Sequence, residues 1–438
     1  MTDQLDRPLP PPDRTSRADR IRSEIVAGGS VREHGDDELA GGWRGFAAMA
    51  AIVALFAWLA TVNIWWFAFV VGVVVSVFLH ELGHFATARW TGMKATQFFL
   101  FFGPRLWSFR RGETEYGVRA LPLGAFVRII GMNRMDDDVA PGDEGRTYRQ
   151  QSFPRRLLVI SAGSLMHVII AVVLLFAVYV GQGERTLLPE VVVGQAVPGL
   201  PAEQAGIRDG DRITSVGGIE VRDPIELGEA VRSFEPRQVI DVDVVRDGRD
   251  LTIPVGLAPR VDVPEGDPSF GTTYLGVSSY SPVTYVRHSI PAAAGNALVD
   301  VVPTAWESTK GVVKALNPVN IVTHLSGSND DLTTRPVTLV GVTALSDDVG
   351  RSEGVFGVLW LLAVLNVFVG VFNMFPLLPL DGGHAAVAIY ERVREAMRGG
   401  RQRYFADVER LMPFAMGVVV LLFAFMFAGL YLDISQPL

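Results

Sequence analysis

An uncharged run of 34 residues, from Phe46 to Leu79, constrains what this chain can fold into more than any other feature. As a single helix it would be about 51 Å long, at roughly 1.5 Å per residue, whereas the hydrocarbon core of a bilayer is about 30 Å thick. Thr61-Val62-Asn63 is the only polar interruption of the run, and Trp65-Trp66 follows it, as at a membrane interface. The run therefore predicts two membrane-spanning helices, at about 46–62 and 64–89.

Three further apolar stretches are long enough to cross a bilayer. They lie at about 157–180, 355–376 and 411–432, and each approaches the roughly 20 residues that a spanning helix needs. The sequence thus predicts a polytopic α-helical membrane protein. Residues 1–45 are rich in Pro, Asp, Arg and Gly without apolar periodicity, so we expect a disordered N-terminal tail.

Lysines and arginines in the connecting loops predict the orientation. They are concentrated between the second and third spans and again at 392–403, between the last two. By the positive-inside rule both loops are cytoplasmic, so residues 181–354 and the short tail 433–438 face outward. The formal charge of −8 argues against nucleic acid as a partner. The absence of cysteine excludes disulfides and thiolate metal sites.

The outward region contains a stretch, 186–258, that is predicted to fold on its own. Short β-rich runs such as 239–245 alternate there with Gly, Pro and Asp turns. The segment from Gly199 to Asp211 resembles the middle of a bacterial PDZ domain, a small α+β module that binds peptides by adding a strand to a sheet edge. A steric spacer is the alternative. Residues 281–354 include Pro291, Pro303, Pro318 and Pro336, and we expect irregular helices resting on the outer membrane surface.

The motif His80-Glu81-Leu82-Gly83-His84 lies at the cytoplasmic end of the second span. Residues four apart share one face of a helix, so both imidazoles can reach one metal ion. Two histidines and one carboxylate form a zinc site that leaves one position open for water. Glu81 is displaced around the helix and can act as a general base. Ionisable groups inside an apolar helix are costly, which favours a functional role.

A third ligand is required, and Asp381 is the main candidate. It stands in the sequence NMFPLLPLDGGH, residues 373–384, where two prolines and two glycines break the end of a span. It follows His84 by 297 residues (381 − 84), so folding must bring the two together. His384 is a rival ligand, but a set of three histidines would leave Asp381 unexplained.

Together the two motifs resemble the site-2 protease family of intramembrane zinc metalloproteases, and the PDZ-like insert resembles its bacterial branch. Further similar segments lie within 91–124. The resemblance implies that His80, His84 and Asp381 bind one Zn²⁺, that Glu81 is the catalytic base and that Asn373 helps to hold the substrate backbone. It also implies that residues 94–131 form a membrane-associated β-hairpin that guides substrate.

The resemblance organises the chain into two membrane metalloprotease halves, 64–180 and 355–432. They form a four-helix core to which the helix at 46–62 is an addition. The implied function is hydrolysis of a peptide bond within or near the transmembrane segment of a single-span membrane protein already shortened on its outer side. Such substrates include anti-sigma factors and remnant signal peptides. The implied location is the cell membrane, with the lipid bilayer as a partner and a peptide as the ligand of the PDZ-like domain.

One motif departs from the family pattern. The second core span of the family carries Gly-Pro-x-x-Asn, whereas this chain has Gly163-Ser-Leu-Met-His167. We interpret His167 as a structural histidine, and the acidic run 136–138 as a solvated face. Two other functions compete: a metal or ion transporter with a PDZ sensor, and an inactive membrane adaptor. The scarcity of other ionisable groups in the spans opposes the first, and the intact Glu81 opposes the second.

Overall fold

The computed structural model describes residues 43–132, 139–260, 270–327, 334–399, 403–406 and 411–436. The chain divides into two compact units, which are described separately. The first consists of residues up to Gly181 and from Ser289 onward, and the second of Gln182–His288. The acidic run 136–138 and most of the N-terminal tail lie outside the described residues, and so do Arg401 and the last two residues.

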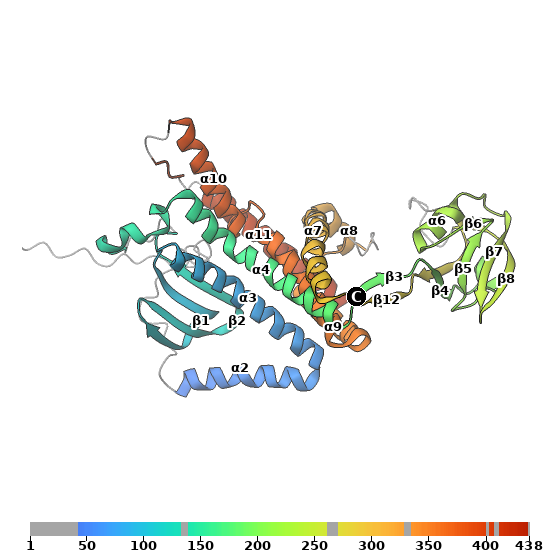
Figure 1. The fold of residues 1–438 in the computed structure, drawn as a ribbon, viewed down its shortest axis with the longest axis horizontal. Coiled ribbons are helices and arrows are strands. Elements are labelled where there is room, and N and C mark those ends of the chain that lie inside the picture. The colour runs from blue at the N-terminus through green and yellow to red at the C-terminus, as the bar shows by residue number, and fades with distance from the viewer. Residues whose placement is uncertain are drawn as a thin grey trace, which may run out of the picture. The chain divides into compact units, whose positions relative to one another are not determined.

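Five helices of the first unit are long and apolar enough to cross a membrane, counted over the described ranges, and they confirm the five predicted spans. They are α2 (Trp43–Val62), α3 (Ile64–Trp90), α4 (Phe153–Gly181), α9 (Leu339–Asn373) and α11 (Met412–Ser435). The same unit contains α7 (Ile290–Ala315), α8 (Pro318–Leu325), α10 (Asp381–Met397), strands β1 (Ala95–Arg111) and β2 (Thr114–Ile129), and the short 3-10 helices Pro141–Arg146 and Tyr148–Gln150. Figure 1 shows their order along the chain.

The break between α2 and α3 has a local cause. The side chain of Asn63 accepts hydrogen bonds from the backbone N–H groups of Trp65 and Trp66, at 2.9 and 3.1 Å. Asn63 has an extended conformation and is the N-cap of α3, a position where asparagine is among the preferred residues because its oxygen satisfies otherwise unpaired donors. The uncharged run therefore forms two helices rather than one.

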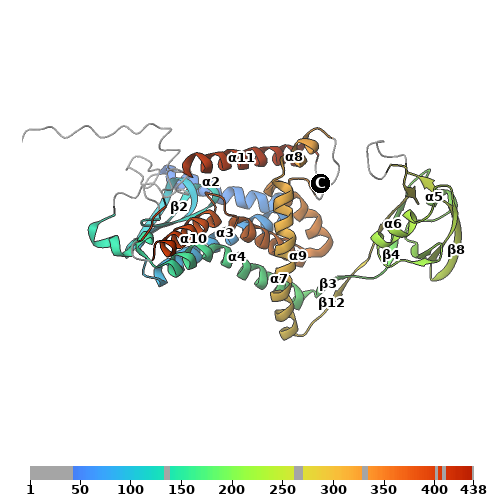
Figure 2. The same ribbon diagram turned by 90° about the horizontal axis from the view of Figure 1, so that it is seen from above.

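Two helical segments differ from what the sequence predicts. α7 is a continuous helix, not an irregular one, because Ala293, Ala297 and Val301 recur every four residues and form one apolar stripe. This stripe is buried against residues of α4 and α9, and Figure 2 shows the ribbon of α7 next to those two helices. α9 begins 16 residues earlier than the predicted span (355 − 339), but it consists of two helical segments that meet at a kink at Gly354, where φ is 68°, so the predicted start coincides with the start of the second segment.

The start of α9 is tied to the end of α11. The carboxylate of Asp433 accepts hydrogen bonds from the backbone N–H groups of Thr338 and Gly341, at 2.9 and 3.1 Å. Asp433 thereby caps α9 from another helix, in the place where a negative charge favours a helix N-terminus. The guanidinium of Arg335 lies 3.6 Å from the same carboxylate.

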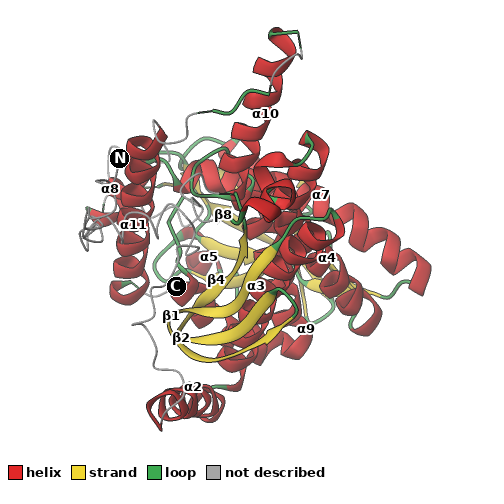
Figure 3. Cartoon of the chain, turned by 90° about the vertical axis from the view of Figure 1, so that its left-hand side faces the viewer, coloured by secondary structure: helices red, strands yellow, loops and turns green. Residues whose placement is uncertain are grey.

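Strands β1 and β2 form a strongly bent antiparallel hairpin in the region where the sequence predicts one. Phe99 pairs with both Gly117 and Phe126, so each long strand folds back and contributes two segments to the sheet. The bend in β1 passes through Phe101 and Gly103, both with positive φ. Gly117 cannot carry a Cβ, because one would overlap the ring of Phe99. The curved sheet lies beside α3 (Figures 1 and 3).

The second unit is built around a sheet with the strand order β11-β4-β5-β7-β8, with β6 paired to β5. Its core contains apolar residues of the strands and of the helices α5 and α6. The elements are β3 (Glu184–Leu187), β4 (Val191–Ala196), α5 (Pro201–Ala205), β5 (Arg212–Val216), β6 (Ile219–Glu220), α6 (Pro224–Arg232), β7 (Val239–Arg246), β8 (Arg249–Gly256), β9 (Ala258–Pro259), β10 (Thr273–Tyr274), β11 (Val277–Tyr280) and β12 (Val283–Val286). The chain is thus a membrane protein with an inserted β-rich domain.

This unit extends beyond the stretch 186–258 that the sequence singles out. β11 pairs with β4, and β12 pairs with β3. The last strand of the unit therefore lies beside its first strand. At the same place the imidazole of His288 lies 2.7 Å from the Glu184 carboxylate. These three contacts join the entry and exit of the insertion.

A buried ion pair stabilises the second unit. Arg246 donates hydrogen bonds of 2.7 and 2.6 Å to Asp211, whose side chain is 1% exposed. Burial alone would raise the pKa of the Asp211 carboxyl, but the hydrogen bonds from Arg246 and from the Arg208 N–H outweigh it and hold the pKa below its ordinary value.

We predict that Asp211→Asn lowers the free energy of unfolding of this unit by about 2 kcal/mol at neutral pH. A lowered folded-state pKa stabilises the fold above the unfolded pKa, about 3.9, and this stabilisation is lost as the pH falls through the lower folded value. Calorimetry of the full chain in detergent should therefore show a difference between wild type and variant that shrinks below pH 4. Asp250→Asn, at an exposed position on β8, is the control. A difference independent of pH would contradict the prediction.

Candidate active site

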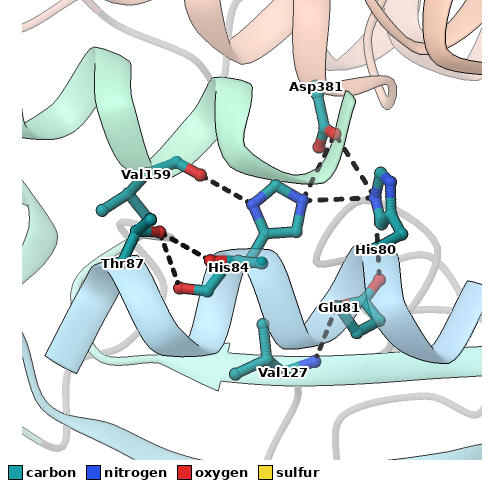
Figure 4. Close-up of polar contacts among 8 residues, drawn as sticks. His80, Glu81, His84, Thr87, Val127, Val159 and Asp381 are labelled. Carbon is teal, nitrogen blue, oxygen red and sulfur yellow. Dashed lines mark hydrogen bonds and ion pairs between the residues drawn. The ribbon is translucent and has the colours of Figure 1, made fainter. Parts of the chain in front are cut away.

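Helix α3 presents His80 and His84 on one face, as their spacing predicts. Both are buried, with 8% and 6% of their surfaces exposed. Their Nε2 atoms are 3.2 Å apart, and the rings meet edge to face. Figure 4 shows the two imidazoles converging on one point from α3.

Helix α4 fixes the ring of His84. The Nδ1–H group of His84 donates a 2.7 Å hydrogen bond to the backbone oxygen of Val159. Because a carbonyl oxygen only accepts, Nδ1 carries the proton and Nε2 keeps its lone pair for a metal. One turn further along α4, Gly163 lies so close to the imidazoles that a Cβ would overlap both His80 and His84. The missing side chain at Gly163 lets α4 pack against the site.

Asp381 reaches the histidines from the first turn of α10. The chain ends α9 at Asn373 and passes through a compact turn before α10 begins. Gly382 and Gly383 pack directly on the backbone of this turn, and a Cβ at either position would overlap main-chain atoms of residues 374–378. The Asp381 Oδ2 atom lies 3.4 Å from the His80 Nε2 and 3.3 Å from the His84 Nε2.

These three atoms have the spacing of zinc ligands. Zinc binds nitrogen and oxygen ligands at about 2.0–2.1 Å in tetrahedral sites, which places any two ligand atoms about 3.3–3.4 Å apart. The separations of 3.2, 3.3 and 3.4 Å match that value. In addition, Asp381 Oδ2 is buried and makes no hydrogen bond to the described residues. His80, His84 and Asp381 could therefore hold a metal ion, and two imidazoles with one carboxylate are a typical donor set for zinc.

Glu81 lies beside these three residues but is not one of them. Its Oε1 atom is 4.0 Å from the His80 Nε2. Its Oε2 atom accepts a 3.1 Å hydrogen bond from the backbone N–H of Val127 on β2. The curved sheet thus contacts the carboxylate directly, as Figure 4 shows. Nothing in the local sequence pattern around Val127 signals this contact, because it depends on how the hairpin packs on α3.

The other residues singled out from the sequence lie near the site without joining the ligand set. Asn373 is the last residue of α9 and is partly exposed. His384 lies in the first turn of α10, and its ligating atoms are outside the cluster formed by His80, His84 and Asp381. His167 is buried on α4, and its Nδ1 is 2.8 Å from the side-chain oxygen of Asn366. That bond agrees with the interpretation of His167 as a satisfied histidine.

Comparison with known proteins identifies the family. The profile of peptidase family M50 matches residues 68–422, which include both halves of the site. The chain belongs to peptidase family M50. It is 32% identical over 405 residues to the zinc metalloprotease Rip1 of Mycolicibacterium smegmatis, covering 84% of this chain and 97% of that protein. The Rip1 protein of Mycobacterium tuberculosis strain H37Rv is 33% identical over 406 residues, with the same coverage.

Membership in family M50 settles the class of the protein. It is a zinc metalloprotease of the site-2 type, an enzyme that carries out intramembrane proteolysis. The five apolar helices and the Rip1 relatives make it a multi-pass membrane protein. The expectation of zinc as cofactor is likewise confirmed.

The close approach of α4 gives a direct test of the site geometry. We predict that Gly163→Ala lowers zinc affinity at least about tenfold, because the added methyl group displaces both imidazoles. The measurement is zinc per purified protein during titration with a chelator. Gly311→Ala places the same methyl group in open space on α7, so this control should bind zinc as the wild type does. Equal zinc retention in the two variants would refute the prediction.

Proposed function

We propose that His80, His84 and Asp381 are the zinc ligands of this M50 protease and that Glu81 is its general base. The observation that carries the assignment is the triangle of ligand atoms with sides of 3.2, 3.3 and 3.4 Å. The Glu81 carboxylate lies next to this triangle, with Oε1 on the side of His80. Three ligands leave the fourth tetrahedral position open, as in catalytic zinc sites.

The chemistry of peptide hydrolysis divides among these groups. Zinc, when bound, activates water and polarises the scissile carbonyl. Glu81 accepts the proton of the attacking water and then donates it to the nitrogen of the leaving amine. Asn373, which ends α9 just before the turn that leads to Asp381, is proposed to hold the substrate backbone by hydrogen bonds.

The assignment predicts that zinc binding and turnover separate in different variants. Glu81→Gln should keep its zinc and lose cleavage by a factor of at least about 10², since the ligands survive and the base does not. Asp381→Ala should lose both, because two neutral imidazoles bind zinc far more weakly than a complete set of three ligands. The measurements are zinc content of the purified proteins and cleavage of one membrane substrate.

His384→Ala is the matched control for Asp381→Ala, because the two residues lie three apart in α10. This variant should keep most of its zinc. Loss of zinc from the His384 variant with full retention in the Asp381 variant would reverse the ligand assignment. Undiminished cleavage by Glu81→Gln would rule out Glu81 as the base.

The substrate is proposed to be a single-span membrane protein already shortened on its outer side, such as an anti-sigma factor or a remnant signal peptide. A transmembrane helix hides its peptide bonds in its own hydrogen bonds, so the reacting segment must be extended. The bent sheet of β1 and β2 supports a guiding role, because the backbone of β2 reaches the site at Val127. An extended segment near this strand would lie beside Glu81.

The inserted β-rich unit is proposed to be a PDZ-like domain that binds peptide. A cavity of about 370 Å³ lies between α6 and residues 272–279, with Leu227, Val231, Leu275 and Val277 in its lining. β11 stands at one end of the strand order, so its outer edge offers backbone groups to an added strand. In the proposed role the domain admits shortened substrates and rejects those with intact outer domains.

The active site is proposed to lie near the cytoplasmic face, with the inserted unit outside. At one end of the bundle, Arg156 at the start of α4 pairs with Glu391 of α10 at 2.6 Å, close to the basic loops. The other end gathers the segments that the charge rule assigns to the outside. There Asp433 caps α9, and Trp65 packs against Gly350. The contacts within the first unit are consistent with one orientation.

Single cysteines test the orientation cleanly because the natural chain has none. Arg249→Cys places a thiol at an exposed position of β8, and Arg392→Cys places one at an exposed position of α10. A membrane-impermeant maleimide should label the first variant in intact cells. The second should be labelled only after the membrane is permeabilised. The opposite pattern would overturn the proposed orientation.

A further inference from the structure

A continuous chain of buried hydrogen bonds joins three helices beside the metal site. His167 on α4 contacts Asn366 on α9 at 2.8 Å, and the Asn366 Nδ2 donates to Ser76 Oγ on α3 at 3.1 Å. The hydroxyl of Ser76 in turn donates to the backbone oxygen of Gly72 at 2.8 Å. Exposure is 2% for His167, 1% for Asn366 and 6% for Ser76. Polar groups at such depth are costly, so a complete chain of them calls for a function.

The donor and the acceptor of each hydrogen bond in this series can be assigned from the bonds that the Asn366 amide makes. Asn366 also donates to the backbone oxygen of Leu362 at 2.8 Å, which occupies the second hydrogen of its amide. The Oδ1 atom of Asn366 is therefore the acceptor, and the Nδ1–H group of His167 is the donor. From donor to acceptor, the hydrogen bonds run from His167 to Asn366 to Ser76. They end at the backbone oxygen of Gly72, on the helix that carries His80.

His80 is the metal ligand that depends on this arrangement. The His84 ring is held by its bond to Val159, whereas the Nδ1 of His80 is buried beside the Gly163 backbone without a hydrogen bond of good geometry. Packing against neighbouring rings therefore contributes to the orientation of the His80 ring. One neighbour is His84, and the other is the ring of His167, 5.0 Å away between centroids.

The spacing of residues along α3 and α4 explains how this series of hydrogen bonds reaches the metal site. Ser76, His80 and His84 are four residues apart and share one face of α3. Val159, Gly163 and His167 share one face of α4 in the same way. The two stripes face each other, and Asn366 of α9 links their ends. At Gly370, one turn after Asn366, a Cβ would lie 3.2 Å from the Cβ of His167, so α9 packs tightly here.

We propose that His167 is a positioning residue for the zinc ligand His80, held in place by Asn366 and Ser76. The proposal rests on the ligand set proposed above. His167 does not bind the metal; it fixes the orientation of the neighbouring imidazole through ring packing. Residues that orient metal ligands typically change metal affinity or activity 10- to 100-fold when replaced.

The amide side chains of Asn and Gln distinguish the two nitrogens of His167. In an Asn side chain the amide nitrogen stands where a histidine has Nδ1, and in Gln it stands near the place of Nε2. His167→Asn can therefore keep the donor to Asn366, whereas His167→Gln cannot. Both variants place an amide in the same buried position. Comparing them therefore separates the effect of the hydrogen bond to Asn366 from the energetic cost of burying any polar group there.

The experiment measures zinc affinity by chelator competition, and kcat and KM with one membrane substrate, for the full-length protein. His167→Leu, His167→Gln and Asn366→Leu should each lose zinc affinity and kcat by about 10- to 100-fold, with KM within about twofold of wild type. His167→Asn should recover part of both, because it keeps the hydrogen bond to Asn366 but lacks the ring that packs on His80. Ser164→Ala is the control: it lies on α4 three residues before His167, and its buried hydroxyl makes no hydrogen bond to the described residues.

Two results would overturn the proposal. If His167→Leu or Asn366→Leu binds zinc and cleaves as the wild type does, the hydrogen-bond chain has no positioning role. If His167→Gln recovers function and His167→Asn does not, the Nε2 side of the ring acts and the bond to Asn366 is incidental. His80→Ala, measured in parallel, tests the ligand set independently, because its zinc loss depends on His80 alone. Zinc retention there would refute the ligand assignment before His167 is considered.

Discussion

The absence of water inside a bilayer is the constraint on which the rest of this structure depends. A hydrolytic site at membrane depth must obtain its hydrogen bonds from the protein, because unsatisfied polar groups there cost several kcal/mol each. The backbone meets much of this need: Val159 accepts from His84, and Val127 donates to Glu81. Backbone partners require close approach, which explains why glycine occupies position 163.

The same constraint shapes the segment that carries Asp381. A regular helix would continue from α9 and carry the carboxylate away from α3. Instead the chain leaves the helix at Asn373, makes a turn whose N–H groups bond within the segment itself, and begins α10 at Asp381. The two glycines after Asp381 let the new helix lie on the backbone of that turn. The Asp381 carboxylate and its supporting turn are one structural unit.

The parts that the sequence predicts well are those governed by local rules. Apolar length predicts the five spans, and a spacing of four residues places His80 and His84 on one face of α3. Asp381 is selected by the Pro- and Gly-broken end of its span, and the motif resemblance supports it, but no local rule predicts that it meets the two histidines. The features that escape prediction are contacts between distant segments. The pairing of β11 with β4 extends the inserted unit beyond residue 258. The apolar stripe of α7 is buried by residues of α4 and α9, which lie far from it in the sequence. The bond between His167 and Asn366 spans 199 residues and has no local signature.

The long separation of the ligands has a consequence for how the enzyme is made. In the proposed ligand set, His80 and His84 lie in the N-terminal part of the protein, and Asp381 follows His84 by 297 residues (381 − 84). At about 5–20 residues per second, translation of the intervening chain takes about 15–60 s. During that interval the nascent chain holds a base and two imidazoles in the membrane without a complete metal site. Proteolytic competence therefore arises only after the inserted domain has been synthesised, so a ribosome-bound fragment cannot attack neighbouring membrane proteins.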